Sequence, residues 1–135
     1  MRETTHAVRC LTLILFCLLL AGCGSEDGLA RVKGKVTLNG QPLEGAIVQF
    51  QPTAEDGSPS AGKTDAKGRY ELLYTFNTPG AMPGEHIVSI RTAGAYYDEE
   101  GSDAEREERV PAKYNTRTEL RRTVERGTNT INFEL

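Results

Sequence analysis

The densest group of side chains that could bind a metal is an acidic run in the C-terminal half of the chain. Its members are Asp98, Glu99, Glu100, Asp103, Glu105, Glu107 and Glu108. Carboxylate oxygens of this kind are the ligands that Ca²⁺ prefers. The spacing lacks the alternating ligands around a central glycine that an EF-hand loop requires, and Arg106 and Arg109 neutralise part of the run. The pattern therefore favours a solvated loop, and we expect no metal or cofactor.

A catalytic histidine is the second candidate. The chain has two histidines, and His86 is the only one that would remain after cleavage before Cys23. Nucleophilic catalysis needs an activated nucleophile with a base beside it. No serine stands in a nucleophile-elbow pattern, and no cysteine is near His86 in the sequence. In an extended strand, His86 shares a face with Val88 and Ile90. We therefore interpret it as a packing residue at the end of a strand, expect no catalytic residue, and predict that the protein is not an enzyme.

Two surface patterns could serve binding. Tyr96, Tyr97 and Tyr114 could form an aromatic platform for a sugar or a peptide, but adjacent residues of an extended chain point to opposite faces. Packing of the loop is the favoured interpretation of these rings. Lys33 and Lys35 form an outward basic stripe, which we interpret as a charged edge that discourages strand pairing.

The N-terminal segment has the pattern of a secretory signal peptide. Arg2 and Arg9 precede an apolar run over residues 10–21, which is too short to span a bilayer. The residues that follow, Leu20-Ala21-Gly22-Cys23, resemble the lipobox of bacterial lipoproteins. The resemblance implies a signal peptide over residues 1–22, lipidation of Cys23 and a tether over residues 23–30. A single domain over residues 31–135 is then expected.

Cleavage before Cys23 has consequences for the mature chain. It removes two arginines and one glutamate, so the formal net charge of −3 becomes −4. This mild acidity argues against nucleic acid as a partner. With Cys10 and Cys17 removed and Cys23 acylated, no disulfide or thiolate metal site is expected. Gly24 stands where many Gram-negative lipoproteins carry the aspartate that retains them in the inner membrane, and the resemblance therefore favours the outer membrane.

The domain itself reads as strands joined by turns. Arg31–Leu38 alternates apolar and polar residues, Asn39-Gly40 is a strong hairpin turn, and a return strand begins at Gly45 and stops at Pro52. Residues 63–74 predict a second hairpin, turned by Asp65 and Gly68. Further strands are expected over residues 85–92, 118–126 and 128–135. The pattern predicts seven strands and no long helix, which is typical of a β-sandwich.

The same alternation predicts which residues are buried. The expected core residues are Val36, Val48, Phe50, Tyr70, Leu72, Val88, Ile90, Ile131 and Phe133. Ile47 is expected on the outer face of its strand. Arg122 falls on the apolar side of its strand, a conflict that a bulge or an edge position would resolve. Ser102 and Glu105 have capping-box spacing, which allows a helical turn up to Arg109.

Several motifs together resemble the carboxypeptidase regulatory-like domain family. They are Gly34-x-Val36, Asn39-Gly40-x-Pro42-Leu43-x-Gly45-Ala46-x-Val48, Thr64-Asp65-x-x-Gly68-x-Tyr70-x-Leu72, and Pro83-Gly84 before a strand. The C-terminal motifs are similar to those of short transthyretin-like lipoproteins of planctomycete bacteria. They are Val110-Pro111-Ala112-Lys113-Tyr114-Asn115, Thr118-Glu119-Leu120 and Asn132-Phe133-Glu134-Leu135. The resemblance implies an all-β, seven-stranded, Greek-key sandwich of the transthyretin-like (prealbumin-like) kind, and its motifs contain turn and core positions but no catalytic residue.

The function expected from these patterns is that of a lipid-anchored, extracytoplasmic binding or structural accessory domain. Its partners would be membrane lipid, through acylated Cys23, and a cell-envelope protein or polysaccharide. A carbohydrate-binding module at the cell surface is the first alternative, and it predicts an exposed, coplanar pair of aromatic rings. A small hydrolase is the second. Transthyretin-like hydrolases resemble one another in histidine- and arginine-bearing motifs that this sequence lacks.

Overall fold

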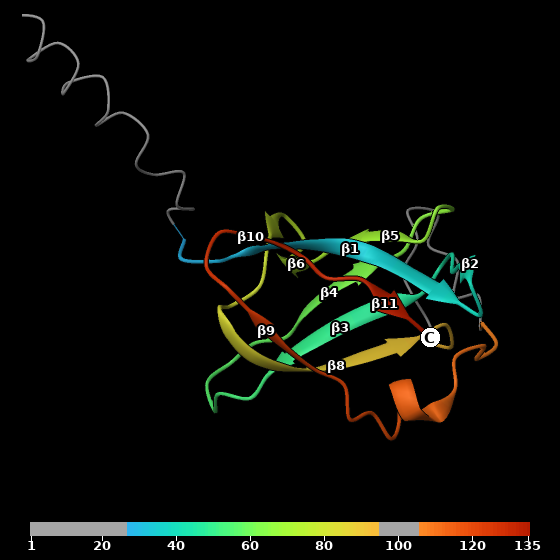
Figure 1. The fold of residues 1–135 in the computed structure, drawn as a ribbon. Helices are drawn as coiled ribbons and strands as arrows, with labels where there is room; N and C mark the ends of the chain where they lie inside the picture. The colour runs from blue at the N-terminus through green and yellow to red at the C-terminus, as the bar shows by residue number, and fades with distance from the viewer. Residues whose placement is uncertain (1–26, 95–105) are drawn as a thin grey trace, which may run out of the picture.

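The protein folds into two β-sheets. The computed structural model describes residues 27–94 and 106–135, and within these ranges it contains eleven strand segments and one 3-10 turn (Figure 1). The predicted all-β class is confirmed. The segments are β1 (Arg31–Leu38), β2 (Gln41–Pro42), β3 (Ile47–Pro52), β4 (Ser60–Lys63), β5 (Arg69–Glu71), β6 (Leu73–Thr75), β7 (Thr78–Pro79), β8 (Gly84–Arg91), η2 (Ala112–Tyr114), β9 (Arg121–Val124), β10 (Thr128–Thr130) and β11 (Phe133–Glu134).

The first sheet is built around β1. Strands β10 and β11 pair with β1 in parallel, whereas β2 and β5 pair with it antiparallel. Lys33 is the register partner of both Thr130 in β10 and Glu71 in β5, so β1 is flanked on both sides. The interpretation of Lys33 and Lys35 as an edge stripe is therefore wrong. Both lysines are exposed on the outer face of a central strand, because the C-terminal residues of the chain cover the edge that the sequence suggested.

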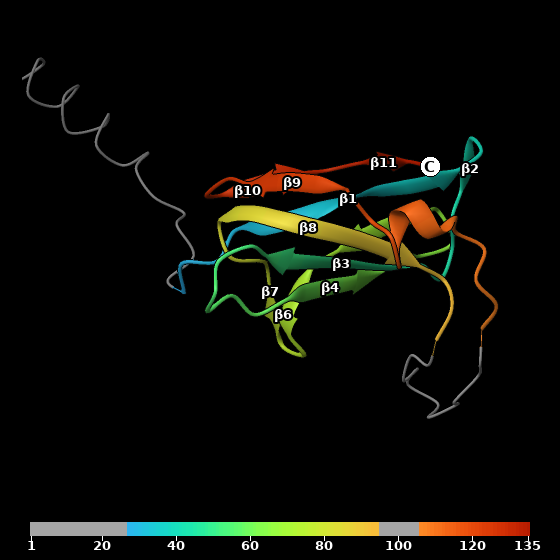
Figure 2. The same cartoon turned by 90° about the horizontal axis from the view of Figure 1, so that it is seen from below.

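The second sheet has the strand order β7-β6-β4-β3-β8-β9, and all of its pairings are antiparallel. Figure 2 shows β1 and β11 in one layer and β3 and β4 in the other. Val32 and Val36 of the first sheet and Val48 and Val88 of the second are fully buried. Side chains from both sheets thus fill the space between the layers, as in a β-sandwich.

The turn after β1 forms as predicted, but the strand that follows goes elsewhere. Asn39 and Gly40 both have positive φ, 51° and 80°, as a type I′ turn requires. The hairpin ends after β2, and β3 pairs with β4 and β8 in the second sheet. The predicted pairing of β1 with the return strand is therefore wrong. Leu43, which is buried, and Gly45 lie in the crossover, where the chain leaves one sheet for the other.

The second predicted hairpin also joins different sheets. The predicted turn at Asp65 is confirmed. The Oδ1 atom of Asp65 accepts hydrogen bonds from the amides of Lys67 and Arg69, each 2.9 Å long. The amide of Arg69 contributes most to holding the pKa of Asp65 below its usual value. Strand β4 nevertheless belongs to the second sheet and β5 to the first, which corrects the predicted pairing.

The chain returns to the second sheet at Leu72. The amide of Leu72 donates to the carbonyl of Val32 in β1, and its carbonyl accepts from the amide of Gly80 after β7. The extended segment over residues 69–75 therefore starts in one sheet as β5 and ends in the other as β6. This segment links the two layers along one side of the molecule.

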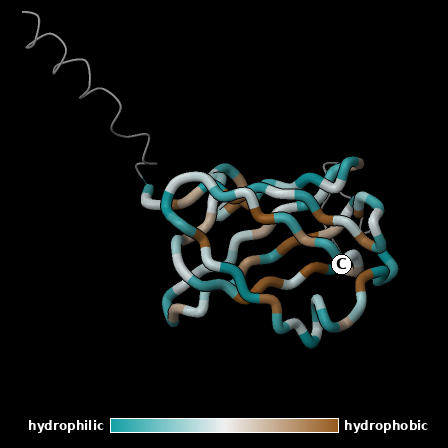
Figure 3. The backbone as a smooth tube through the Cα atoms, in the orientation of Figure 1, coloured by the Kyte–Doolittle hydropathy of each residue, from teal (hydrophilic) through white to brown (hydrophobic). Residues whose placement is uncertain are grey.

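A single hydrophobic cluster fills the space between the sheets. The ring of Phe50 lies at its centre, 5.6 Å from the ring of His86 and 6.1 Å from that of Phe133 between centroids. Figure 3 shows the hydrophobic stretches concentrated on the strands. The cluster contains residues from Ala30 to Phe133, so the two sheets share one core.

The predicted core is largely confirmed. Eight of the nine expected residues are buried, and Ile131 is partly buried against the core, where its carbonyl accepts a hydrogen bond from the hydroxyl of Tyr70. Ile47 does lie on the outer face, opposite Lys63 and Arg91, yet only 8% of it is exposed. Neighbouring side chains on that face cover it.

Two local expectations concern the C-terminal third. The sequence placed Arg122 on the apolar side of its strand, which a bulge or an edge position would explain. Arg122 lies in β9, and β9 is an edge strand of the second sheet. Its guanidinium carbon lies 5.0 Å from the centre of the Phe133 ring, a cation–π arrangement. The expected helical turn up to Arg109 begins outside the described residues, and residues 106–109 are not helical. The short turn η2 instead follows Pro111.

Candidate functional site

Several residues singled out in the sequence lie outside the described residues. They are Cys23, Tyr96, Tyr97, Ser102 and five of the seven acidic residues of the C-terminal run. Among the described residues, no group of three or more His, Cys, Asp or Glu side chains could hold a metal ion. Glu107 and Glu108 are the two members of the acidic run that the structure places.

The carboxylate of Glu108 is used as a cap for backbone groups. It accepts hydrogen bonds from the amides of Thr92 at 3.0 Å, Val110 at 2.9 Å and Ala93 at 3.3 Å. The hydroxyl of Thr92 in turn accepts from the amide of Arg109 at 2.7 Å. Partial burial raises the pKa of Glu108, but the three amides and the Thr92 hydroxyl outweigh it, so its pKa lies below its usual value. This carboxylate therefore links Thr92 and Ala93 with Val110.

His86 is buried in the core. Its exposed fraction is 0%, and its Nε2 atom lies 2.7 Å from the carbonyl oxygen of Met82. That carbonyl can only accept, so Nε2 carries the proton and donates to it. The Nδ1 atom has no hydrogen-bond partner among the described residues. This position agrees with the packing interpretation, since the ring lies against Phe50 and away from solvent.

Tyr114 is the only one of the three candidate tyrosines that the structure describes. It lies in η2 and is partly buried against the core, and the Lys113 ammonium sits 4.8 Å from its ring centre. The described part of the chain contains no pair of exposed, coplanar aromatic rings that includes this residue. One ring face of Tyr114 is thus already occupied.

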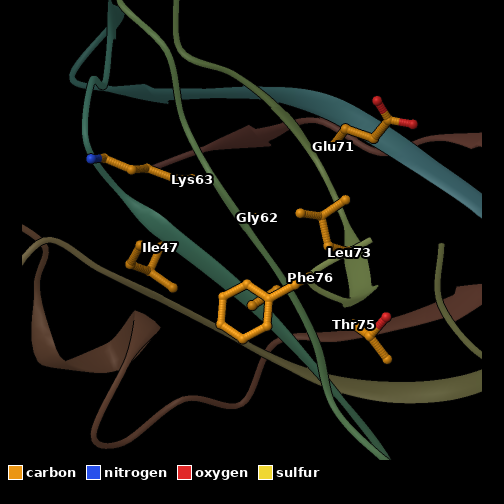
Figure 4. A pocket seen from close by; sticks show the side chains of 8 residues that line it. Ile47, Gly62, Lys63, Glu71, Leu73, Thr75 and Phe76 are labelled. Carbon is orange, nitrogen blue, oxygen red and sulfur yellow. The ribbon is translucent and has the colours of Figure 1, made fainter. Parts of the chain in front are cut away.

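The most distinctive surface feature is a groove of about 520 Å³ on the outer face of the second sheet. Its lining residues are Ile47, Ala61, Gly62, Lys63, Glu71, Leu73, Thr75 and Phe76. Figure 4 shows Ile47 and Lys63 on one side of it, Glu71, Leu73 and Thr75 on the other, and Phe76 between them. Below, we call this feature the Phe76 groove. Its volume falls in the range of ligand sites in proteins.

Local sequence explains how the Phe76 groove forms. The register pairs Ile47 with Lys63 and Ala61 with Leu73, so these four side chains share the outer face of β3, β4 and β6. A Cβ atom at Gly62 would lie 2.3 Å from the carbonyl oxygen of Glu71. Only glycine lets the layer-crossing segment approach β4 so closely, and this approach brings the two walls together.

The turn between β6 and β7 holds Phe76 out into solvent. The hydroxyl of Thr75 donates to that of Thr78 at 2.8 Å, which closes the turn around Phe76 and Asn77. Phe76 is 96% exposed and Leu73 is 39% exposed, and these are the two large exposed hydrophobic residues in the described ranges. An almost fully exposed ring adds nothing to the stability of its own fold, which makes Phe76 a candidate contact residue.

The charged groups at one end of the groove are Lys63 and Glu71. Glu71 also forms an ion pair with Arg31, 3.7 Å long and about half exposed on both sides. A second hollow of about 540 Å³ lies beside Lys113, Arg117, Glu119 and Leu120, but three of these four residues are charged. The Phe76 groove is the one that offers an apolar surface together with an exposed ring.

Reasoning from the sequence missed this groove. Residues 75–82 read as a turn by composition, and Ile47 and Leu73 belong to different predicted elements. One signal was present in the sequence, because Phe76 stands among Thr75, Asn77 and Thr78, where a turn has no interior to bury a phenyl ring. A large apolar residue in a polar turn of this kind indicates either a contact with the body of the protein or an exposed binding residue.

Comparisons with known proteins add little to this description of the groove. No protein-family model matches the chain, and no curated protein matches it. Among solved structures, a DUF3823 family protein from Parabacteroides merdae is similar at 18% sequence identity, with a TM-score of 0.42. The match covers 78% of this chain and 44% of that one, so the chain spans less than half of that protein's length.

Proposed function

We propose that the protein is a lipid-anchored, extracytoplasmic binding or structural accessory domain that is attached to the membrane through acylated Cys23. The lipobox-like residues 20–23 support this proposal, and the folded domain starts only eight residues after Cys23, with β1 at Arg31. Within residues 27–94 and 106–135, no helix is both long and apolar enough to cross a membrane. Gly24 supports placement in the outer membrane.

We also propose a transthyretin-like, Greek-key topology for the domain. Two observations support the seven strands that this topology needs. Segments β5 and β6 are separated only by Leu72, and β10 and β11 both pair with β1 in one continuous direction. If each pair counts as one interrupted strand and the two-residue segments β2 and β7 are set aside, seven strands remain.

The binding role is proposed for the Phe76 groove. The observation that carries it is the exposed ring of Phe76 beside the partly exposed side chain of Leu73, at a hollow that Ile47 and Ala61 also line. Burying apolar surface is the main favourable term in protein association. The residues of the groove are held by strand pairing rather than by a long loop, so the site is formed before a partner arrives.

The non-catalytic part of the proposal is supported by where the titratable groups lie. The His86 ring is enclosed in the core with Nε2 bonded to Met82, and the Glu108 carboxylate binds three backbone amides. Both groups thus have structural roles in this fold. The carbohydrate-binding alternative would have to use Phe76 or Tyr74 among the described aromatic residues, since Phe50, Tyr70 and Phe133 are buried and Lys113 lies over the ring of Tyr114.

Anchoring is tested by the substitution Cys23→Ser. Two acyl chains bury many methylene groups, each contributing about 0.8 kcal/mol, and so hold a protein on a membrane stably. In the wild type we expect labelled palmitate to be incorporated and the protein to partition into the detergent phase. Both should be lost in the variant. A variant that is still processed and still partitions with detergent would contradict the proposal, and density-gradient fractionation of the wild type tests its outer-membrane placement.

Binding through the groove is tested by photo-cross-linking in cells. A photoreactive phenylalanine analogue replaces Phe76 in one variant and Thr130 in the control. Thr130 lies on the first sheet and is also exposed, so both probes face solvent. We expect discrete cross-linked products from position 76 alone. Equal products from both positions, or none from position 76, would contradict the assignment of the groove.

A further inference from the structure

We propose that a hollow at the crossover between β2 and β3 binds a phosphate group. The hollow has a volume of about 340 Å³, and its lining residues are Glu44, Gly45, Lys63, Thr64, Arg106 and Arg109. Below, we call it the Arg106 hollow. It is a different site from the Phe76 groove, although Lys63 lines both of them.

Two arginine side chains are held over consecutive residues of the crossover. The Nη2 atom of Arg109 donates a hydrogen bond to the carbonyl oxygen of Glu44 at 2.7 Å. The Nη1 atom of Arg106 occupies the space beside Gly45, where a Cβ atom would lie only 2.7 Å from it. Gly45 has a positive φ of 74°, so the backbone favours glycine there and leaves this space open. The two guanidinium groups therefore line the same hollow at neighbouring positions.

No ion pair balances the charge of these arginines. Within residues 27–94 and 106–135, neither Arg106 nor Arg109 belongs to an ion pair, and the side chain of Arg106 donates no hydrogen bond. The nearby Glu108 carboxylate binds three backbone amides, and the exposed Glu44 is the one carboxylate among the described lining residues. Arg106 is partly buried, which makes an unpaired cation costly, and a bound anion would offset that cost. Lys63 has an interaction of its own, so the two arginines carry the proposal.

A buried hydroxyl group adds a neutral donor to the lining. Thr64 is 3% exposed, and its Oγ1 atom accepts a hydrogen bond from the amide of Ala46 at 2.8 Å. A hydroxyl can accept and donate at once, and among the described residues the hydrogen of Thr64 Oγ1 has no acceptor. The carbonyl of Thr64 accepts from the amide of Gly45 at 3.1 Å, and its amide donates to the carbonyl of Ala46 at 2.9 Å. The backbone thus fixes this hydroxyl in place before a ligand arrives.

Three donor groups around one hollow select a ligand with several acceptor oxygens. Each guanidinium presents its N–H groups as a fork that matches two oxygens. A carboxylate is satisfied by one fork, whereas the terminal oxygens of a phosphate accept from two arginines and a hydroxyl together. The described lining carries one lysine and two arginines against one glutamate, on a chain with a formal net charge of −3. This local excess of positive charge favours the dianion of a phosphate.

The position of the Arg106 hollow favours a soluble ligand over a lipid headgroup. Strands β1 and β8 run in the same direction, and both end at the end of the sandwich opposite to the start of β1 (Figure 1). Arg91, the last residue of β8, is the register partner of Ile47, two residues after Gly45, so the hollow lies at that far end. With the anchor proposed at Cys23, the start of β1 lies on the membrane side and the hollow faces away from the lipid. Only this choice of a soluble source rests on the proposed anchoring.

The test is isothermal titration calorimetry of the full chain in non-ionic detergent and in phosphate-free buffer of low salt, where charge interactions are least screened. Inorganic phosphate, glucose 6-phosphate, acetate and glucose are titrated separately. We expect saturable binding of both phosphate compounds with a Kd of about 1 mM or tighter, about tenfold weaker binding of acetate, and no binding of glucose. Tighter binding of the ester identifies a phosphate monoester as the source, and tighter binding of inorganic phosphate identifies the free anion.

Variants test the lining residues. Arg106→Gln and Arg109→Gln should each weaken phosphate binding by about tenfold or more, because each removes a charge-assisted fork. Thermal unfolding of Arg106→Gln should match that of the wild type, since this side chain donates no hydrogen bond within the described ranges. The matched control is Arg126→Gln, the same change at an exposed position before β10, which should leave the Kd unchanged.

Three results would overturn the inference: no phosphate binding in the wild type, equal binding in Arg106→Gln, or acetate binding as tight as that of phosphate. None of them bears on acylation of Cys23 or on cross-links from position 76, which test the proposed function separately.

Discussion

The strongest quantitative prediction concerns Phe50, which we expect to be the most costly aromatic residue to truncate. Phe50 is fully buried in the middle of β3, and its ring contacts those of His86 and Phe133. Truncation to alanine removes roughly 120–160 Å² of buried apolar surface, which at about 25 cal/mol per Å² is worth about 3–4 kcal/mol. The cavity left behind brings the expected loss to about 3–5 kcal/mol.

The assay is urea unfolding of residues 24–135 in dilute solution. With a dependence of about 1.5 kcal/mol per molar urea, the midpoint of Phe50→Ala should fall by about 2–3 M. Phe76→Ala is the matched control, because the same substitution at a 96% exposed position should change stability by no more than about 0.5 kcal/mol. A loss under about 1 kcal/mol for Phe50→Ala, or equal losses in both variants, would refute the strand register.

Three further substitutions probe two contacts within the first sheet and the backbone contacts of Glu108. Gly34→Ala should lower the free energy of unfolding by about 1–3 kcal/mol, because its Cβ would lie 1.8 Å from the carbonyl oxygen of Ile131; unchanged stability would mean that β1 and residue 131 are farther apart. Tyr70→Phe should lose about 1 kcal/mol, since the hydroxyl donates to that carbonyl at 2.6 Å, and a neutral result in urea unfolding would contradict this bond. Glu108→Gln should be destabilised near pH 7, because a carboxylate with a lowered pKa stabilises the fold above its unfolded pKa. That difference from wild type should disappear as the pH falls through the folded pKa, and a difference independent of pH would argue against the amide contacts.

Local features of the fold could be predicted from the sequence because short-range physics decides them. The positive φ values at Asn39 and Gly40 follow from the turn type, and the Asp65 turn follows from a side chain that bonds its own backbone. Alternation identified the buried residues of β1, β3 and β8. It also identified Arg122 as a conflict, which the edge position of β9 resolves.

Strand partners could not be predicted in the same way. Alternation states which face of a strand is buried but not which strand lies beside it, and both predicted hairpins proved to join different sheets. The parallel pairing of β1 with the C-terminal residues is non-local, and the Lys33 and Lys35 interpretation failed for this reason. The Phe76 groove depends on β3, β4 and β6 being neighbours, so it could only be found once the pairing was known.

The central position of β1 determines how the domain responds to mechanical force. The proposed tether would enter at the start of β1, at Arg31, and β1 is hydrogen-bonded on both sides by β10, β11, β5 and β2. A pull on the tether along the strand would load these ladders in shear, so many hydrogen bonds must break together rather than one after another. Forced unfolding depends on the unfolding barrier and not on equilibrium stability. A domain pulled from the start of its first strand in this way can be of modest equilibrium stability and still withstand tension, which suits the proposed attachment through Cys23.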